Sequence, residues 1–299
     1  MILLIMATVA TTANAQKGHY FHANVGVGLH RLDYDLDCSN YEKSPHLGFT
    51  GELGWQWFFT NHFGLGLGAN FKTLGTTCKL AHTQNTDNLT DKDNGLTYTE
   101  NVVFNNLEES DKMCVADIPL SLYFQTSLSK RWRLLAGING FYTLVLSQKY
   151  ECNSGNLAVS KYFPDYDLEY SGLEDKEHGV YSASGFSGDM KLKKSTYGAG
   201  LQLQACRAIG EKRKLELTFG IYGLYHFPDQ RDSYVGKIFN AETETYKGIT
   251  QSGMVGKVTS TNFGGTVGIR YHIDIKEKPM PRKVSLPKYL APGQFQWWY

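Results

Sequence analysis

Six charged residues occupy the polar positions of stretches in which apolar residues fill every second position. They are three acids and three bases: Glu52, Lys72, Asp117, Arg133, Glu216 and Arg270. Charges held away from water are tolerated when they pair and form hydrogen bonds. If these side chains share one interior, we expect an ion-pair and hydrogen-bond network that fills it. The alternative is that they line a narrow gated pore.

Motifs for catalysis and for metal binding are incomplete in this chain. Ser187 lies in the stretch GFSG but Asp189 follows, so the G-x-S-x-G nucleophile motif is not formed. His22 and His30 share one face of a predicted strand, about 26 Å apart, which is too far for one metal ion. Loop candidates for an enzyme exist, but no spacing fixes their geometry: His178, His226 and Asp229. We expect no enzymatic activity, no cofactor and no metal.

The chain has five cysteines and contains no C-x-x-C pair, which gives no support to zinc or redox motifs. A tight turn near residue 60 would bring Cys78 opposite residue 42, close to Cys38. This favours a Cys38–Cys78 disulfide and leaves Cys114–Cys152 by elimination, although a sequence does not decide connectivity. Cys206 would then stay unpaired.

Eight stretches alternate with period two, as β-strands do. Each is about 11 to 13 residues long, whereas ordinary strands average about 5 to 6 residues and a tilted strand that crosses a bilayer needs about 9 to 11. The stretches are 20–30, 46–58, 63–73, 115–125, 132–144, 196–206, 214–225 and 262–273.

The glycines are distributed unequally between the two faces of these stretches. Most of them, such as Gly54 and Gly264, fall on the face opposite the apolar residues, although a few, such as Gly51 and Gly140, share the apolar face. An eight-stranded barrel has barely enough room inside for its own side chains. Small residues inside and apolar residues outside therefore predict an all-β fold: an eight-stranded antiparallel transmembrane β-barrel.

The connections alternate between short and long. Short turns follow the second, fourth and sixth stretches, and long connections follow the others: 31–45, 74–114, 145–195 and 226–261. Outer-membrane barrels have short periplasmic turns and longer external loops. We therefore expect four long extracellular loops and both termini in the periplasm. The connection 74–114 is acidic, which predicts a solvated loop or, alternatively, a site for calcium or a cationic partner.

The two ends of the chain differ from the barrel. An apolar run leads to Ala13-Asn14-Ala15, which predicts a signal peptide over residues 1–15 and a cut before Gln16. Residues 16–275 then form the barrel. Prolines and lysines dominate residues 276–299, which we expect to be a periplasmic tail, either a disordered end or a docking peptide.

Three motifs resemble the porin-like outer-membrane β-barrel domain family of Gram-negative bacteria. They are DIPLSLYF at Asp117–Phe124, the glycine-bearing stretch Trp132–Leu144, and GGTVGIRYHI at Gly264–Ile273. The resemblance covers residues 18–275 and is to small barrels similar to the barrel domain of outer membrane protein A. It implies residence in the bacterial outer membrane.

Together these features predict a structural scaffold that displays surface loops for interaction or adhesion. A narrow small-solute channel and an assembly partner that acts through residues 276–299 are the alternatives. The expected partners are outer-membrane lipid and lipopolysaccharide, a surface ligand bound by the loops, and a periplasmic protein bound by the tail. The net charge of +1 gives no support for a nucleic-acid partner.

Overall fold

The computed structural model describes residues 17–171, 179–233 and 236–273, and most of these residues lie in β-strands. Long strands arise because alternate positions are apolar along each of them, as the sequence predicts. The eight longest are β1 (Gly18–Leu36), β2 (Tyr41–Phe58), β3 (Phe63–Thr90), β4 (Thr97–Ser127), β5 (Trp132–Phe163), β9 (Ser195–Ile209), β10 (Leu215–His226) and β13 (Val255–Ile273).

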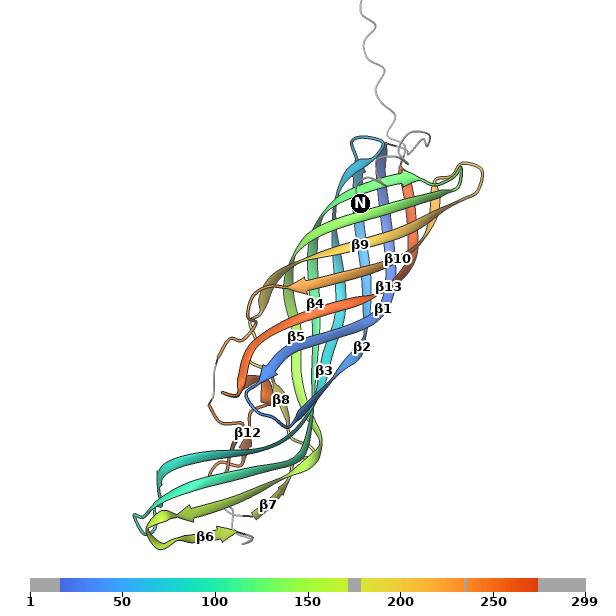
Figure 1. Ribbon diagram of the computed structural model, residues 1–299. Coiled ribbons are helices and arrows are strands. Elements are labelled where there is room, and N and C mark those ends of the chain that lie inside the picture. The colour runs from blue at the N-terminus through green and yellow to red at the C-terminus, as the bar shows by residue number, and fades with distance from the viewer. Residues whose placement is uncertain (1–16, 172–178, 234–235, 274–299) are drawn as a thin grey trace, which may run out of the picture.

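These strands form a closed antiparallel ring. Each pairs with its neighbour in the order β1-β2-β3-β4-β5-β9-β10-β13, and β13 pairs with β1 from His19↔Ile273 to Leu36↔Val255. Closure leaves no unpaired strand edge in the ring. The strands wrap obliquely around a common axis (Figure 1). The predicted eight-stranded barrel is confirmed.

The outer surface of the ring is apolar. Large hydrophobic side chains stand exposed along every strand, for example Leu53 and Leu120, each 64% exposed, and Val25, 62% exposed. In water such a continuous apolar surface would be unstable, whereas in a bilayer it meets hydrocarbon. None of the helices in the described part of the chain is long and apolar enough to span a bilayer.

The glycines follow the same division between inside and outside. A methyl group at Gly54 would lie 2.3 Å from Cε1 of His22, and one at Gly48 would lie 2.2 Å from Nδ1 of His30, so the interior has no room for it. At Gly51 and Gly140, on the outer face, a methyl group would meet nothing within 4 Å. The inward glycines therefore make space for neighbouring polar side chains.

The strands extend well beyond the predicted spans at one end of the barrel. The interpretation of 74–114 as a loop is wrong for most of its length, because β3 and β4 pair as far as Thr90↔Thr97. β5 likewise continues to Phe163, and these three strands bend away from the barrel axis (Figure 1). We call this the loop end, and the opposite end, with turns near residues 60, 130 and 212, the turn end.

Short elements pack against the extended strands. They are η2 (Pro164–Tyr166), β6 (Leu168–Ser171), β7 (Gly179–Ser182), β8 (Ser187–Asp189), β11 (Phe239–Asn240), β12 (Thr245–Tyr246) and η3 (Ile249–Gln251). β6, β7 and β8 each pair with β5, and β11 pairs with β12. Together with the loop-end parts of three strands, they form the loop-end domain. These parts are β3 from residue 74 onward, β4 up to residue 113, and β5 from residue 145 onward.

The loop-end domain has its own hydrophobic core. Buried apolar residues from β1, β3, β4, β5 and β13 meet residues of the connection between β10 and β13, including Ile238, Phe239 and Ile249. On β3 the apolar residues now point inward, at Leu74, Cys78 and Leu80, whereas Leu65 and Leu67 in the ring point outward. This reversal marks the passage from lipid to water along a single strand.

The start of β1 and the end of β13 lie side by side at the turn end, because His19 is paired with Ile273. The predicted signal peptide (1–15) and tail (276–299) lie outside the described residues. Their roles, and a periplasmic location of the two termini, stay predictions.

Candidate functional site

The lumen at the turn end is organised around Arg270, which is fully buried. Its guanidinium lies 3.0 Å from Glu216, donates to Gln56 at 2.8 Å, and stacks over the ring of Tyr20 with 3.6 Å to the centroid. Arg133 also pairs with Glu216, at 3.1 Å. Charge-assisted hydrogen bonds and cation–π contacts are strong where water is excluded. They close this end of the barrel.

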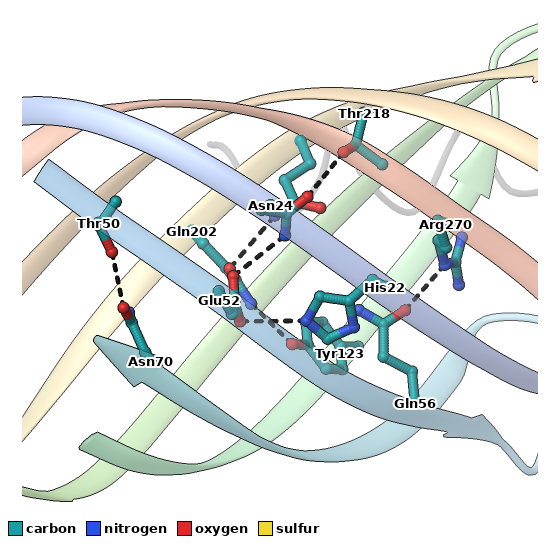
Figure 2. Close-up of polar contacts among 11 residues, drawn as sticks. His22, Asn24, Thr50, Glu52, Gln56, Asn70, Tyr123, Gln202, Thr218 and Arg270 are labelled. Carbon is teal, nitrogen blue, oxygen red and sulfur yellow. Dashed lines mark hydrogen bonds and ion pairs between the residues drawn. The ribbon is translucent and has the colours of Figure 1, made fainter. Parts of the chain in front are cut away.

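A second layer of contacts crosses the middle of the lumen (Figure 2). Glu52 lies 3.2 Å from Nε2 of His22 and accepts a hydrogen bond from Asn24 at 3.1 Å. Thr218 donates to Asn24 at 2.8 Å, which ties β10 to β1. Gln202 donates to the hydroxyl of Tyr123 at 2.9 Å, from the opposite wall. The contacts of Glu52 join the neighbouring strands β1 and β2, whereas the other two join strands that are not neighbours in the ring.

A third layer lies toward the loop end, where Lys72 and Asp117 form a buried ion pair at 2.5 Å. The hydroxyl of Thr143 donates to Asp117 at 2.7 Å, so its oxygen can accept the proton on Nε2 of His226, 3.0 Å away. Nδ1 of His226 then accepts from Ser260 at 2.6 Å. We assign a neutral His226 protonated on Nε2, because only that tautomer satisfies all three hydrogen bonds.

Little free space remains between these layers. The cavity lined by Asn24, Glu52, Asp117, Asn139 and Tyr222 has a volume of about 30 Å³. A space of this size holds one or two water molecules. The lumen in this structure is therefore a packed polar core rather than an open path.

All six charged residues singled out from the sequence point into this lumen, and each has a partner. Lys72 pairs with Asp117, Arg133 and Arg270 share Glu216, and Glu52 contacts His22 and Asn24. Sequence reasoning did not identify the neutral partners Gln56, Thr143 and Ser260. For Gln56 and Thr143 the inward position along the alternating strands is the signal that could have found them, whereas Ser260 lies in the segment 226–261, which was interpreted as a loop.

Two buried carboxylic acids of β4, Glu109 and Asp111, anchor the loop-end domain. Tyr34 donates a hydrogen bond to Asp111 at 3.0 Å, and the backbone N–H of Ile249 donates to Glu109 at 2.9 Å. Glu109 also accepts from the hydroxyl of Tyr246. The sequence placed both acids in a solvated loop, and that expectation is wrong because β4 turns them inward.

Burial shifts the pKa of these acids. It raises the pKa of Glu109 to about 7, since the low-polarity surroundings disfavour the charged form. The pKa of Asp111 is raised well above its usual value, first by burial and then by the neighbouring Glu109. Both shifts favour the protonated, neutral forms of the pair.

The cysteines are free thiols. The predicted Cys114–Cys152 bond is wrong, because Cys114 is paired with Ser147 in the sheet whereas Cys152 is paired with Glu109. That register separates them by five residues along the strands, about 17 Å, and a disulfide needs Cα atoms within about 7 Å. The Cys38–Cys78 bond is also absent, although Cys78 belongs to the core of the loop-end domain and Cys38 packs against that core.

The enzyme candidates have separate environments. His226 is buried in the lumen, Asp229 forms an ion pair with Arg231 at 2.9 Å, and His178 lies outside the described residues. Among the described residues, no cluster of three or more His, Cys, Asp or Glu side chains could hold a metal ion.

The closed ring, its apolar outside and its polar core define the class: a small transmembrane β-barrel. A family model described as "Outer membrane protein beta-barrel domain" matches residues 13–278. The chain belongs to this family, as its motifs indicated, and is a bacterial outer-membrane protein. A comparison with curated proteins found no match to the chain.

Solved structures with a similar fold are small outer-membrane proteins. Neisserial surface protein A is 10% identical, with a TM-score of 0.35, and the match covers 86% of this chain and 97% of that one. OprG from Pseudomonas aeruginosa is 9% identical, with a TM-score of 0.40 and coverage of 88% and 100%. Ail of Yersinia pestis is 8% identical, with a TM-score of 0.34 and coverage of 86% and 100%.

Proposed function

We propose that the protein is a closed outer-membrane anchor that displays its loop-end domain at the cell surface for interaction or adhesion. The observation that carries this proposal is the contrast between the two halves. The lumen is filled by paired polar side chains, whereas the domain beyond it has a separate hydrophobic core. A rigid anchor that carries a folded domain suits recognition. The proposal assigns no chemical reaction to the chain.

The distal end of the domain offers a surface for contact. Tyr166, Leu168 and Tyr170, from η2 and β6, are 63%, 44% and 41% exposed. Aromatic side chains exposed on a surface supply large contact areas in protein recognition. In this proposal the tip, farthest from the membrane, meets the ligand or the neighbouring cell first.

Adhesion of cells that display the protein tests this proposal. We expect cells that carry Tyr166→Ser, Leu168→Ser and Tyr170→Ser to lose most of their binding to host matrix or to neighbouring bacteria. The control is Leu128→Ser with Ile209→Ser, which removes exposed apolar side chains at the turn end. Equal binding by all three proteins, at equal surface amounts, would count against a role of the tip in adhesion.

Conductance in planar bilayers separates an anchor from a small-solute channel. Because the cavity between the layers of the lumen holds only one or two waters, the full chain should produce no steady current. Current steps of an open channel, recorded from the unchanged protein, would reject the closed anchor and favour the channel.

The second alternative is docking through residues 276–299. It requires that deletion of the tail abolishes co-purification of a periplasmic partner.

A further inference from the structure

A trough of about 710 Å³ crosses the outer face of the sheet just beyond the apolar band of the barrel. Its lining includes His46, Thr73, Lys112, Cys114, Lys149 and Asp189, from β2, β3, β4, β5 and β8. These residues lie side by side because Thr73 is paired with Cys114, and Lys112 with Lys149, which in turn is paired with Asp189. The trough is therefore a transverse feature at one height above the membrane.

The chemistry of the trough changes along the membrane normal. On the membrane side it borders Leu47, 64% exposed, and the nearby Leu146, 57% exposed, which continue the lipid-facing surface. Lys112 and Lys149 follow one step higher, and Glu151 and Ser187 lie farther from the membrane. This sequence of apolar, cationic and polar groups matches an amphiphile whose charged head lies above its acyl chains.

Lys112 and Lys149 are direct cross-strand neighbours, both exposed on the outer face. Like charges in this arrangement destabilise a sheet, so folding gives no reason for the pair. Glu151 compensates Lys112 at 3.0 Å, and Asp189 lies beside Lys149 in the register. An anionic group between the two ammonium groups would relieve their repulsion.

The segment that leads into β9 adds positive charge at the same height. Its backbone runs beside β5, since Met190 N–H donates to Gln148 and Val145 N–H donates to Lys194. Along it the exposed side chains are lysines: Lys191, Lys193 and Lys194. The segment 229–232 pairs with it, since Leu192 and Arg231 form a bridge. Five lysines and Arg231 therefore stand near four carboxylates, Glu151, Asp189, Asp229 and Asp232, which leaves an excess of positive charge on this face of the barrel.

We propose that the trough binds the phosphorylated head group of a glycolipid of the outer leaflet, lipopolysaccharide, with a phosphate between Lys112 and Lys149. The acyl chains lie against Leu47 and Leu146, and the sugar hydroxyls meet Ser147 and Ser187. Ammonium groups bind phosphate as point charges, and a trough beside the hydrocarbon boundary selects a lipid over a soluble anion. This binding is independent of the proposed adhesion by the tip.

Native mass spectrometry of the full chain in detergent, titrated with bis-phosphorylated lipid A, tests the proposal. Lys112→Gln with Lys149→Gln should weaken lipid A binding about 10- to 30-fold. The matched control, Lys79→Gln with Lys257→Gln, removes two exposed lysines of the loop end outside the trough and should change binding less than about twofold. An unboiled gel band checks that each variant is folded.

Two further arms identify the ligand chemistry. Dephosphorylated lipid A should bind the unchanged protein as weakly as lipid A binds the double variant. Inorganic phosphate at equal concentration should not displace lipid A. An equal loss in the trough variant and its control, unchanged binding of the dephosphorylated lipid, or displacement by inorganic phosphate would each overturn the proposal, the last by showing a site for soluble anions.

Discussion

At the scale of single residues, the interior of the barrel shows which features a sequence reveals. The six charged residues could be assigned to the lumen because each lies out of phase with the apolar positions of its strand. Their partners could not be assigned. Contacts such as Arg270 to Gln56 and Gln202 to Tyr123 cross the barrel, and they depend on the stagger of the closed ring, which no single strand encodes.

The buried pair of Lys72 and Asp117 gives the first prediction. Asp117→Asn leaves an uncompensated ammonium group in the lumen, so it should destabilise the folded barrel by about 3–5 kcal/mol. Lys72→Met combined with Asp117→Leu should recover most of this loss, because neither charge remains. Urea unfolding in lipid vesicles measures both. A single variant as stable as the exposed control Lys130→Met would contradict the role of the pair.

The acids of the loop-end domain give a prediction of pH dependence. The pKa of Glu109 rises from 4.5 to about 7 on folding, so the folded domain binds a proton that the unfolded chain releases. Stability from this group is complete below about pH 4.5 and is lost as the pH rises through about 7. The groups that face the pair are Tyr34, Cys78, Tyr150, Cys152 and Tyr246.

Hydrogen exchange at the amide of Ile249, which donates to Glu109, measures this dependence. Its protection factor should fall between pH 5 and pH 8, and Glu109→Gln should flatten the profile, since glutamine does not titrate. Gln84, whose side chain contacts the backbone of Ile238 and Phe239, offers a control. Gln84→Ala should lower protection equally at every pH. A profile in Glu109→Gln that stays as steep as in the unchanged protein would exclude Glu109 as its cause.

At the scale of elements, the sequence predicts where strands cross the membrane better than where they end. Period-two alternation with apolar residues outward located all eight strands of the ring. Beyond the bilayer the outward positions become polar, as at Lys79, and the inward ones become apolar, as at Leu80 and Phe104. A strand pattern that requires apolar residues at every outward position ends at that reversal. For this reason the strands of the 74–114 hairpin were interpreted as a loop.

The reversal predicts that arginine destabilises the barrel by different amounts at two positions of β3. Leu67→Arg puts a charge on the lipid-facing surface and should destabilise the barrel by about 2–4 kcal/mol. Thr83→Arg lies on the same outward face beyond the band, in water, and should cost less than about 0.5 kcal/mol. Unfolding in vesicles compares the two. Equal costs would show that the membrane boundary lies elsewhere on β3.

At the scale of the whole molecule, the ring and the loop-end domain are joined by continuous strands but have separate cores. The ring closes through β1 and β13, and the contacts that fill its lumen lie on the turn-end side of residue 74 of β3. The domain core instead depends on Val102, Phe104 and Leu107. The sequence predicted the ring, but not a second core in the segments taken for loops.

This separation predicts that the barrel survives loss of the domain. Replacing residues 81–106 with Asn-Gly joins Leu80 to its partner Leu107 through a two-residue turn and removes Val102 and Phe104 from the core. The shortened chain should keep the boiling-sensitive shift of a folded barrel on a detergent gel, because every strand pairing on the turn-end side of Leu80 remains. The rest of its loop end should become sensitive to trypsin, while the intact chain stays resistant. If the shift disappears with the hairpin, the ring needs the domain in order to fold, and the description of a self-sufficient anchor fails.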